Sequence, residues 1–389
     1  MLQRVRDSFF QVGWMLPMFV PASVTMGRAL ANVLFFSYFL WAILALRPGD
    51  FTVRPKLMLL YAAMVLVFLL SVSMAMHPTE ALHTWFRWAA YTLALPVTLA
   101  VLSRNRLDEK RTARVFGLAA LLAMLAFLVF LAIDAWEGKE IARSINGMSM
   151  AYLMPFLVYW IQDMKTATAS RWLMPLVICV AVVGLLFANS STELLVIGTG
   201  LMVMMALMSQ LGRRVFWVAL LLLPMVLLIE LLPKWSELQG SDLMHMLDVW
   251  TSYRASIWVG AFQYPPENAW LGVGMGHAQY YEPFLTVPVK GFHNFLLDVW
   301  HETGVLGLAV LLTLLGYLIG TLLLRLRVVS AELRRRAAPW VASIAAILVA
   351  ASLDHSYGSV SFALIMLFEL AVLLVMLEPK RDQGVATTI

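Results

Sequence analysis

Long apolar segments constrain this chain more than any other feature of its sequence. Of its 389 residues, 61% are hydrophobic and only 13% are charged, a balance typical of a polytopic membrane protein. Because about 20 apolar residues in a helix cross a bilayer, we expect about twelve transmembrane helices. They are predicted at residues 9–26, 29–46, 57–76, 82–102, 113–133, 147–163, 172–188, 192–210, 215–232, 304–324, 339–353 and 360–377. The expected fold is therefore all-α, with residues 1–389 forming a single integral membrane domain.

The positions of lysine and arginine predict how these helices are oriented. Cytoplasmic loops are rich in both residues, and most of the 28 present here fall in alternate loops and near the two ends of the chain. We therefore expect both termini in the cytoplasm and all seven histidines on the outer side. This topology also accounts for the net charge of +5, so a nucleic-acid partner is not expected. The only cysteine, Cys179, argues against a disulfide and a thiolate metal site.

One long polar loop, at about residues 233–303, separates the ninth and tenth predicted helices, and we expect the active site there. Its first part, residues 234–250, has leucines at helical spacing, which favours short amphipathic helices on the membrane surface. Arg254 and Trp258 follow, four residues apart and therefore on one face of a helix that Pro265 ends. The loop continues with a glycine turn that permits close backbone approach, formed by Gly272, Gly274 and Gly276.

His293 and Asn294 stand near the end of this loop, nine residues before a Gly304-x-x-Gly307 pattern and a long apolar run. Histidine titrates near physiological pH, so one at the boundary between membrane and water suits a general base or a partner for a substrate hydroxyl. The alternative is a histidine that anchors a helix at the interface. The glycines and polar neighbours favour the first interpretation.

Three more ionisable residues, Asp298, His301 and Glu302, lie on the same predicted helix as His293. Their i, i+3, i+4 spacing could suit metal ligands, but a solvated or hydrogen-bonded helix face explains it more simply. We therefore expect no metal and no cofactor. His301 and Glu302 are also candidates for substrate binding, and all three could share in proton transfer.

Arginines on the outer side are candidates for binding phosphate, because a guanidinium binds it through two hydrogen bonds and stays charged near lipid. Arg254 fits this role best, since it lies in the loop with the other polar groups. Arg143, just before the sixth predicted helix, is the second candidate. Arg87 lies in the aromatic segment 85–88, where contact with lipid headgroups is the simpler interpretation.

Several of these patterns occur together in a known family. The pair His293-Asn294, nine residues and then Gly304-x-x-Gly307 resemble the signature of the bacterial O-antigen ligases. Arg254-x-x-x-Trp258 with the glycine turn is similar to the arginine element of that family, and residues 142–147 resemble its entry to the sixth helix. The chain departs from the family at Ser191-Thr192-Glu193, where many members carry Ser-Arg-Gly, so one possible phosphate-binding cation is missing.

The resemblance implies a GT-C-like, metal-independent, inverting glycosyltransferase in the bacterial inner membrane, with its active site on the periplasmic face. The expected reaction moves O-polysaccharide from undecaprenyl pyrophosphate to a sugar hydroxyl of lipid A–core. In this assignment His293 activates the acceptor, Arg254 and Arg143 hold the pyrophosphate, and Asn294 orients the site. The expected partners are these two lipid-anchored substrates and membrane lipids.

Other functions stay open at this point. An O-antigen polymerase shares the membrane plan and the donor, and differs in using another lipid-linked glycan as acceptor. A protein O-oligosaccharyltransferase is expected to carry an extended periplasmic domain after its last helix. A transporter of lipid-linked sugars predicts charges deep in several helices, whereas the predicted helices are nearly free of them and the polar groups gather on one side.

Overall fold

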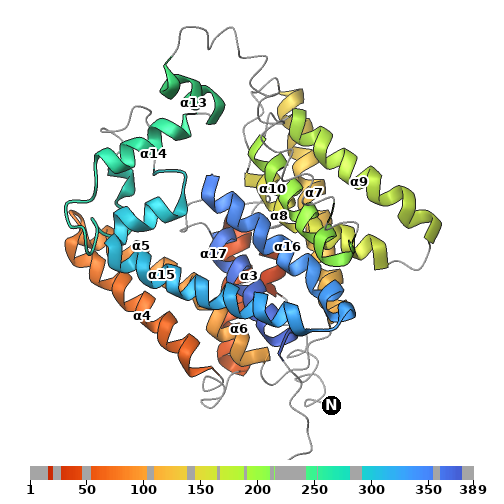
Figure 1. The fold of residues 1–389 in the computed structure, drawn as a ribbon, viewed down its shortest axis with the longest axis horizontal. Helices are drawn as coiled ribbons and strands as arrows, with labels where there is room; N and C mark the ends of the chain where they lie inside the picture. Colours follow the sequence, from red (N-terminus) through yellow and green to blue (C-terminus); the bar gives the residue numbers. More distant parts are fainter. Residues whose placement is uncertain are drawn as a thin grey trace, which may run out of the picture.

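The computed structural model describes residues 16–20, 28–45, 54–102, 109–137, 145–163, 167–187, 191–210, 214, 242–251, 253–280, 291–353 and 360–378. Within these residues all regular structure is helical (Figure 1). The elements are η1 (Leu16–Phe19), α3 (Arg28–Ala45), α4 (Pro55–Ser71), η3 (Val72–Met74), α5 (Pro78–Thr92), α6 (Ala94–Leu102), α7 (Glu109–Trp136), α8 (Ile145–Asp163), α9 (Ala167–Phe187), α10 (Ser191–Met208), α13 (Leu243–Thr251), α14 (Arg254–Gln263), α15 (Phe295–Val328), α16 (Ala331–Leu353) and α17 (Val360–Met376). The predicted all-α class is confirmed for the described part of the chain.

Helices occupy ten of the twelve predicted membrane segments. Of the other two, 9–26 is described only at residues 16–20, and 215–232 lies outside the described residues. By length and composition, five described segments can cross a membrane: Pro55–Met74, Pro78–Leu102, Arg111–Trp136, Phe295–Val328 and Ala331–Leu353. Four shorter apolar helices accompany them. These segments support a multi-pass membrane protein, while the number twelve stays a prediction.

The segment predicted as one helix at 82–102 is instead divided into α5 and α6, which meet at Leu93. Pro96 lies in the first turn of α6, where its missing N–H leaves no helical hydrogen bond unmade. Proline is much less tolerable inside a helix, because there it removes a hydrogen bond and its ring collides with the preceding turn. The division at Leu93 therefore follows from the position of Pro96.

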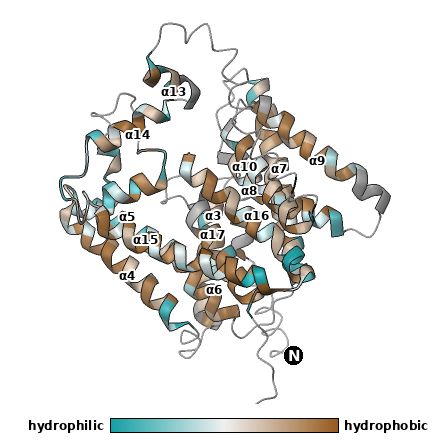
Figure 2. Ribbon diagram, viewed as in Figure 1, coloured by the Kyte–Doolittle hydropathy of each residue, from teal (hydrophilic) through white to brown (hydrophobic). Residues whose placement is uncertain are grey.

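The helices pack in pairs, with α7 on α8, α10 on α16, α4 on α15 and α6 on α17. Aromatic side chains of α7, α8 and α16 meet in the centre, where Phe116, Phe156 and Trp340 lie with ring centroids 4.4–4.9 Å apart. Apolar residues also cover outward-facing helix surfaces (Figure 2); on α4, for example, Leu59 and Leu66 are 72% and 55% exposed. Such an apolar exterior fits a lipid surrounding.

One carboxyl lies inside the apolar core, where the sequence predicted almost no charge. Glu369 of α17 is fully buried and accepts a hydrogen bond of 2.9 Å from the hydroxyl of Ser343 on α16. A bond between two packed helices is a common use of polar groups within membranes. Within the described helices, this pair ties α16 to α17 and does not form the series of charges that a transport path requires.

A sharp bend in α15 shapes the part of the molecule that carries the polar loop (Figure 1). Gly304 has φ 65° and ψ −169°, a conformation outside the helical region, and it divides α15 into residues 295–303 and 305–328. The predicted start of the tenth membrane helix, residue 304, coincides with this bend. The first segment of α15 and α14 lie together at one end of the helices, which we call the loop end.

Candidate functional site

The glycine turn binds the backbone of α15 where that helix is broken. The N–H groups of Val273 and Gly274 donate to the carbonyls of His301 and Glu302 at 2.9 and 3.0 Å. A break in a helix leaves such carbonyls without their helical partners, so the turn satisfies them. Close approach requires glycine here: Gly274 has φ 98°, and a Cβ on it would lie 2.5 Å from the Cβ of Ala75. The predicted turn and its close backbone approach are confirmed.

Asn294 forms the N-cap of α15 and also binds a second helix. Its Oδ1 accepts from the N–H groups of Leu296 and Leu297 at 3.0 and 3.3 Å, which is the usual role of asparagine at this position. Its Nδ2 donates to the carbonyl of Ser352, near the end of α16, at 3.2 Å. Asn294 therefore joins the start of α15 to the end of α16.

His293 precedes α15 and does not lie on it, contrary to the prediction. Because Asn294 is the N-cap, the helix begins one residue later, and His293 adopts φ 51° in the left-handed region. A residue other than glycine rarely takes this conformation, and such backbones gather at functional sites. The His293 side chain is half-buried.

Arg254, the first residue of α14, binds the same end of α16. Its Nε donates to the carbonyl of Leu353 at 2.6 Å, and its Nη1 donates to the carbonyl of Thr251 at 3.0 Å. The C-terminal end of a helix carries partial negative charge, which favours a cation there. Its Nη2 donates to the hydroxyl of Thr192, at the start of α10, at 3.3 Å. Arg254 and Asn294 thus bind successive carbonyls of α16 and are brought together.

Trp258 connects α14 to the segment that carries His293. Its Nε1 donates to the carbonyl of Phe292 at 3.0 Å. Since Trp258 lies one turn, about 5.4 Å, along α14 from Arg254, this bond brings the backbone next to His293 close to Arg254. The predicted helix with Arg254 and Trp258 on one face, ending at Pro265, is confirmed.

The three ionisable residues in the first segment of α15 are all buried: Asp298, His301 and Glu302. The interpretation of a solvated helix face is therefore wrong, and that of a hydrogen-bonded helix face is confirmed. Each residue binds the backbone of a different loop segment. Asp298 Oδ1 accepts from the N–H of Phe292 at 2.9 Å, His301 Nε2 donates to the carbonyl of Ala261 at 2.9 Å, and Glu302 Oε1 accepts from the N–H of Ala278 at 3.4 Å. The three side chains therefore hold the His293 segment, α14 and the glycine turn in place.

The far end of the glycine turn is fixed to the start of α5, which the sequence did not indicate. His277 Nδ1 donates to the carbonyl of Met275 at 3.1 Å, which leaves Nε2 to accept from the N–H of His77 at 3.1 Å. The hydroxyl of Tyr280 donates to Glu80 at 2.8 Å. This hydrogen bond raises the pKa of the Tyr280 phenol above its ordinary value, because ionisation would break it and place two negative charges together.

Arg87, one of the two remaining predicted arginines, is not part of this group. Arg87 is exposed on α5, a helix that packs against α17 and η3. The exposed position of Arg87 agrees with contact to lipid headgroups. Arg87 does not lie with the groups that bind Arg254. Arg143 lies outside the described residues, just before α8 begins at Ile145.

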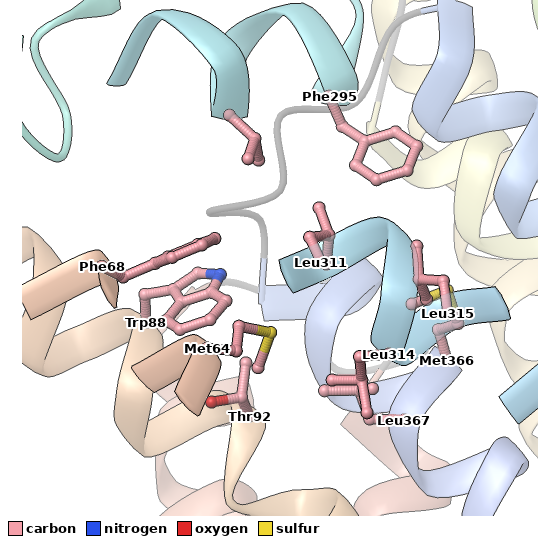
Figure 3. Close-up of a pocket in the computed structure, with 11 residues that line it drawn as sticks. Met64, Phe68, Trp88, Thr92, Phe295, Leu311, Leu314, Leu315, Met366 and Leu367 are labelled. Atoms are coloured by element: carbon pink, nitrogen blue, oxygen red, sulfur yellow. The ribbon is translucent and has the colours of Figure 1, made fainter. Parts of the chain in front are cut away.

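An apolar cavity lies beside the first turn of α15, between that turn and the helices below it (Figure 3). Phe295 and Val299 of α15 are among the residues that line it. Phe68, Trp88 and Leu311 are among the residues on the other sides. The polar group at the loop end thus has an apolar space next to it.

The comparison with known families concerns the same part of the chain. Residues 175–312 match the family model described as O-antigen ligase. The matched range begins within α9 and ends within α15, so it contains Thr192, Arg254, the glycine turn, His293 and Asn294. No curated protein matches the chain. The family match agrees with the resemblance of the His-Asn and Gly-x-x-Gly motifs and supports a membrane protein of the O-antigen ligase/polymerase superfamily.

Proposed function

We propose that the protein is an O-antigen ligase, which transfers O-polysaccharide from undecaprenyl pyrophosphate to a sugar hydroxyl of lipid A–core at the periplasmic face of the bacterial inner membrane. One observation carries the proposal: Arg254, the His293-Asn294 segment and the start of α10 converge at one end of the apolar helices. Both substrates are anchored in lipid, so their reacting groups meet at the membrane surface, where this group would lie.

The donor releases a pyrophosphate, so the site must stabilise negative charge as the glycosidic bond breaks. Arg254 supplies a fixed cation, and the start of α10 adds N–H groups and the positive end of a helix dipole. Nη2 of Arg254 reaches Thr192 at this helix start, where many family members carry an arginine. We assign Arg143 as a second phosphate ligand, since it precedes α8 and α8 packs against both α10 and α16.

The acceptor is a hydroxyl, whose proton must leave as its oxygen attacks the anomeric carbon. We assign His293 as the base that takes this proton. The new C–O bond forms on the face opposite to the pyrophosphate, the old C–O bond breaks, and both electrons leave with the phosphate oxygen, so the configuration inverts. The fixed positions of Arg254 and His293 would then orient donor and acceptor for this step.

Three other predicted site residues have a positioning role in this proposal. His301 and Glu302 are 0% and 6% exposed and are bonded to backbone groups, so they hold the loop and do not contact the substrates. Asn294 orients the site through its bonds to both helices.

The experiment is an electrophoretic lipopolysaccharide profile of cells lacking the gene, complemented with wild-type protein or with single variants. A ligase predicts bare lipid A–core in the deletion strain, with long polymer still attached to its lipid carrier. His293→Ala should fail to restore ligation, whereas His245→Ala, which changes an exposed histidine of α13, should restore it. Arg254→Lys should also fail, because lysine keeps the charge but cannot reproduce the three directed hydrogen bonds.

The same experiment tests the second candidate function. An O-antigen polymerase would use the same donor and the same cation site with a different acceptor. Its deletion would leave lipid A–core capped by a single repeat unit. That profile would replace the ligase assignment with a polymerase. If the His293→Ala protein ligated O-polysaccharide at the wild-type rate, the assignment of His293 as the base would be wrong.

A further inference from the structure

The loop end carries a group of exposed apolar side chains that the proposed reaction does not use. We call this group the α14–Trp270 face, and it consists of Val259, Phe262, Tyr264 and Trp270. Phe262 and Trp270 are each 64% exposed, and Val259 and Tyr264 are 42% and 44% exposed. A loop surrounded by water rarely presents several large apolar side chains together, so the group indicates an apolar surrounding.

The backbone at Trp270 is bonded to the start of the long apolar part of α15. The carbonyls of Ala269 and Trp270 accept from the N–H groups of Val305 and Leu306 at 2.9 and 3.2 Å. Val305 and Leu306 are themselves 45% and 40% exposed and begin the apolar run of a candidate membrane span. The exposed surface of this span therefore continues directly onto Trp270.

The same surface continues on the other side to the end of α4. The side chain of Asn268 donates to the sulfur of Met74 at 3.1 Å, which places this turn against η3. Met74 and Met76 are 41% and 77% exposed. Exposed apolar residues of two candidate spans thus lie beside the turn that carries Trp270, where the α4 span ends at Met74.

Phe262 extends this surface onto α14. Its ring lies 5.4 Å from the ring of Trp300, which is one turn before the bend at Gly304. α14 runs beside the first segment of α15 (Figure 1). Tryptophan and phenylalanine are the residues that interfacial helices and membrane spans place at the boundary between headgroups and acyl chains.

We infer that α14 and the turn that follows it lie in the lipid–water interface, with the α14–Trp270 face inserted into the leaflet at the loop end. The partner of this surface is the lipid bilayer itself. Glu267, exposed on the same loop, remains in water. This inference goes beyond the proposed reaction: because Arg254 begins α14, lipid contact along this helix would set the depth at which its guanidinium meets a substrate.

Spin labels measure this depth in the full-length protein. In a Cys179→Ala background, a nitroxide is attached at F262C or W270C, and the protein is placed in vesicles of phosphatidylethanolamine and phosphatidylglycerol. L312C is the lipid-exposed control, since Leu312 is 47% exposed within the α15 span, and E267C is the water-exposed control. Collision rates are measured with oxygen, which concentrates in lipid, and with a nickel chelate, which stays in water.

Labels at 262 and 270 are expected to show a high oxygen-to-nickel collision ratio that approaches that of L312C, and a depth of about 5–10 Å below the phosphates. A ratio equal to that of E267C would overturn the inference, because the face would then lie in water. Low collision rates with both reagents would also overturn it, since they would mean that protein covers the face. Phe262 is largely exposed, so F262C leaves no internal cavity and tests the inference even where W270C fails to fold.

Discussion

Gly304→Ala should destabilise the protein strongly, because the backbone at this residue is accessible only to glycine. With φ 65° and ψ −169°, alanine would incur about 1–3 kcal/mol of backbone strain. Its Cβ would lie 2.5 Å from the nitrogen of Leu271 and closer still to the carbonyl of Trp270. These are backbone atoms that cannot rotate away, which adds about 1–3 kcal/mol for overpacking. The expected loss in free energy of unfolding is about 2–6 kcal/mol.

Gly316→Ala is the matched control on the same helix. A Cβ at Gly316 meets no atom within 4 Å, and the backbone there is helical, so alanine should leave the stability unchanged or raise it by up to about 1 kcal/mol. Both variants are purified in detergent, and the free energy of unfolding is measured by denaturant titration followed by circular dichroism. If Gly304→Ala unfolded at the same denaturant concentration as Gly316→Ala, the bend at Gly304 would not hold the loop as described.

Substitutions at three further residues separate the structural roles around His293. Asn294→Ala removes the N-cap and should lower the free energy of unfolding by about 1 kcal/mol. Asn294→Asp keeps the cap and loses the donor to Ser352, so its free energy of unfolding should stay near that of the wild type while its transfer rate falls. Trp258→Phe removes the bond to the Phe292 carbonyl; steady-state kinetics should show a lower kcat with little change in KM, and an unchanged kcat would mean that this bond does not position His293. Asp298→Leu leaves the buried N–H of Phe292 without an acceptor at a cost of about 1–3 kcal/mol, while Asp298→Asn retains an acceptor and should unfold close to wild type in the same titration.

Local features of the sequence predicted much of the loop correctly. The spacing of Arg254 and Trp258, with Pro265 after them, predicted α14 and its end. The alternating glycines predicted a turn of close backbone approach, which Gly272 and Gly274 confirm. These predictions succeed because proline and glycine act through the backbone geometry of their own residues, which does not depend on distant parts of the chain.

The sequence by itself determined that this chain is a helical membrane protein, since the length of its apolar segments leaves little else, and its motifs predicted the polar loop as the site. Only the tertiary structure decided which groups the candidate site residues bind. Asn294 caps α15 and binds α16, and Arg254 is held by the carbonyl of Leu353; His301 is buried against α14. Each of these partners is a backbone carbonyl distant in sequence. Every residue has such a carbonyl, so no pattern of side chains reveals which one a folded chain will bring within reach.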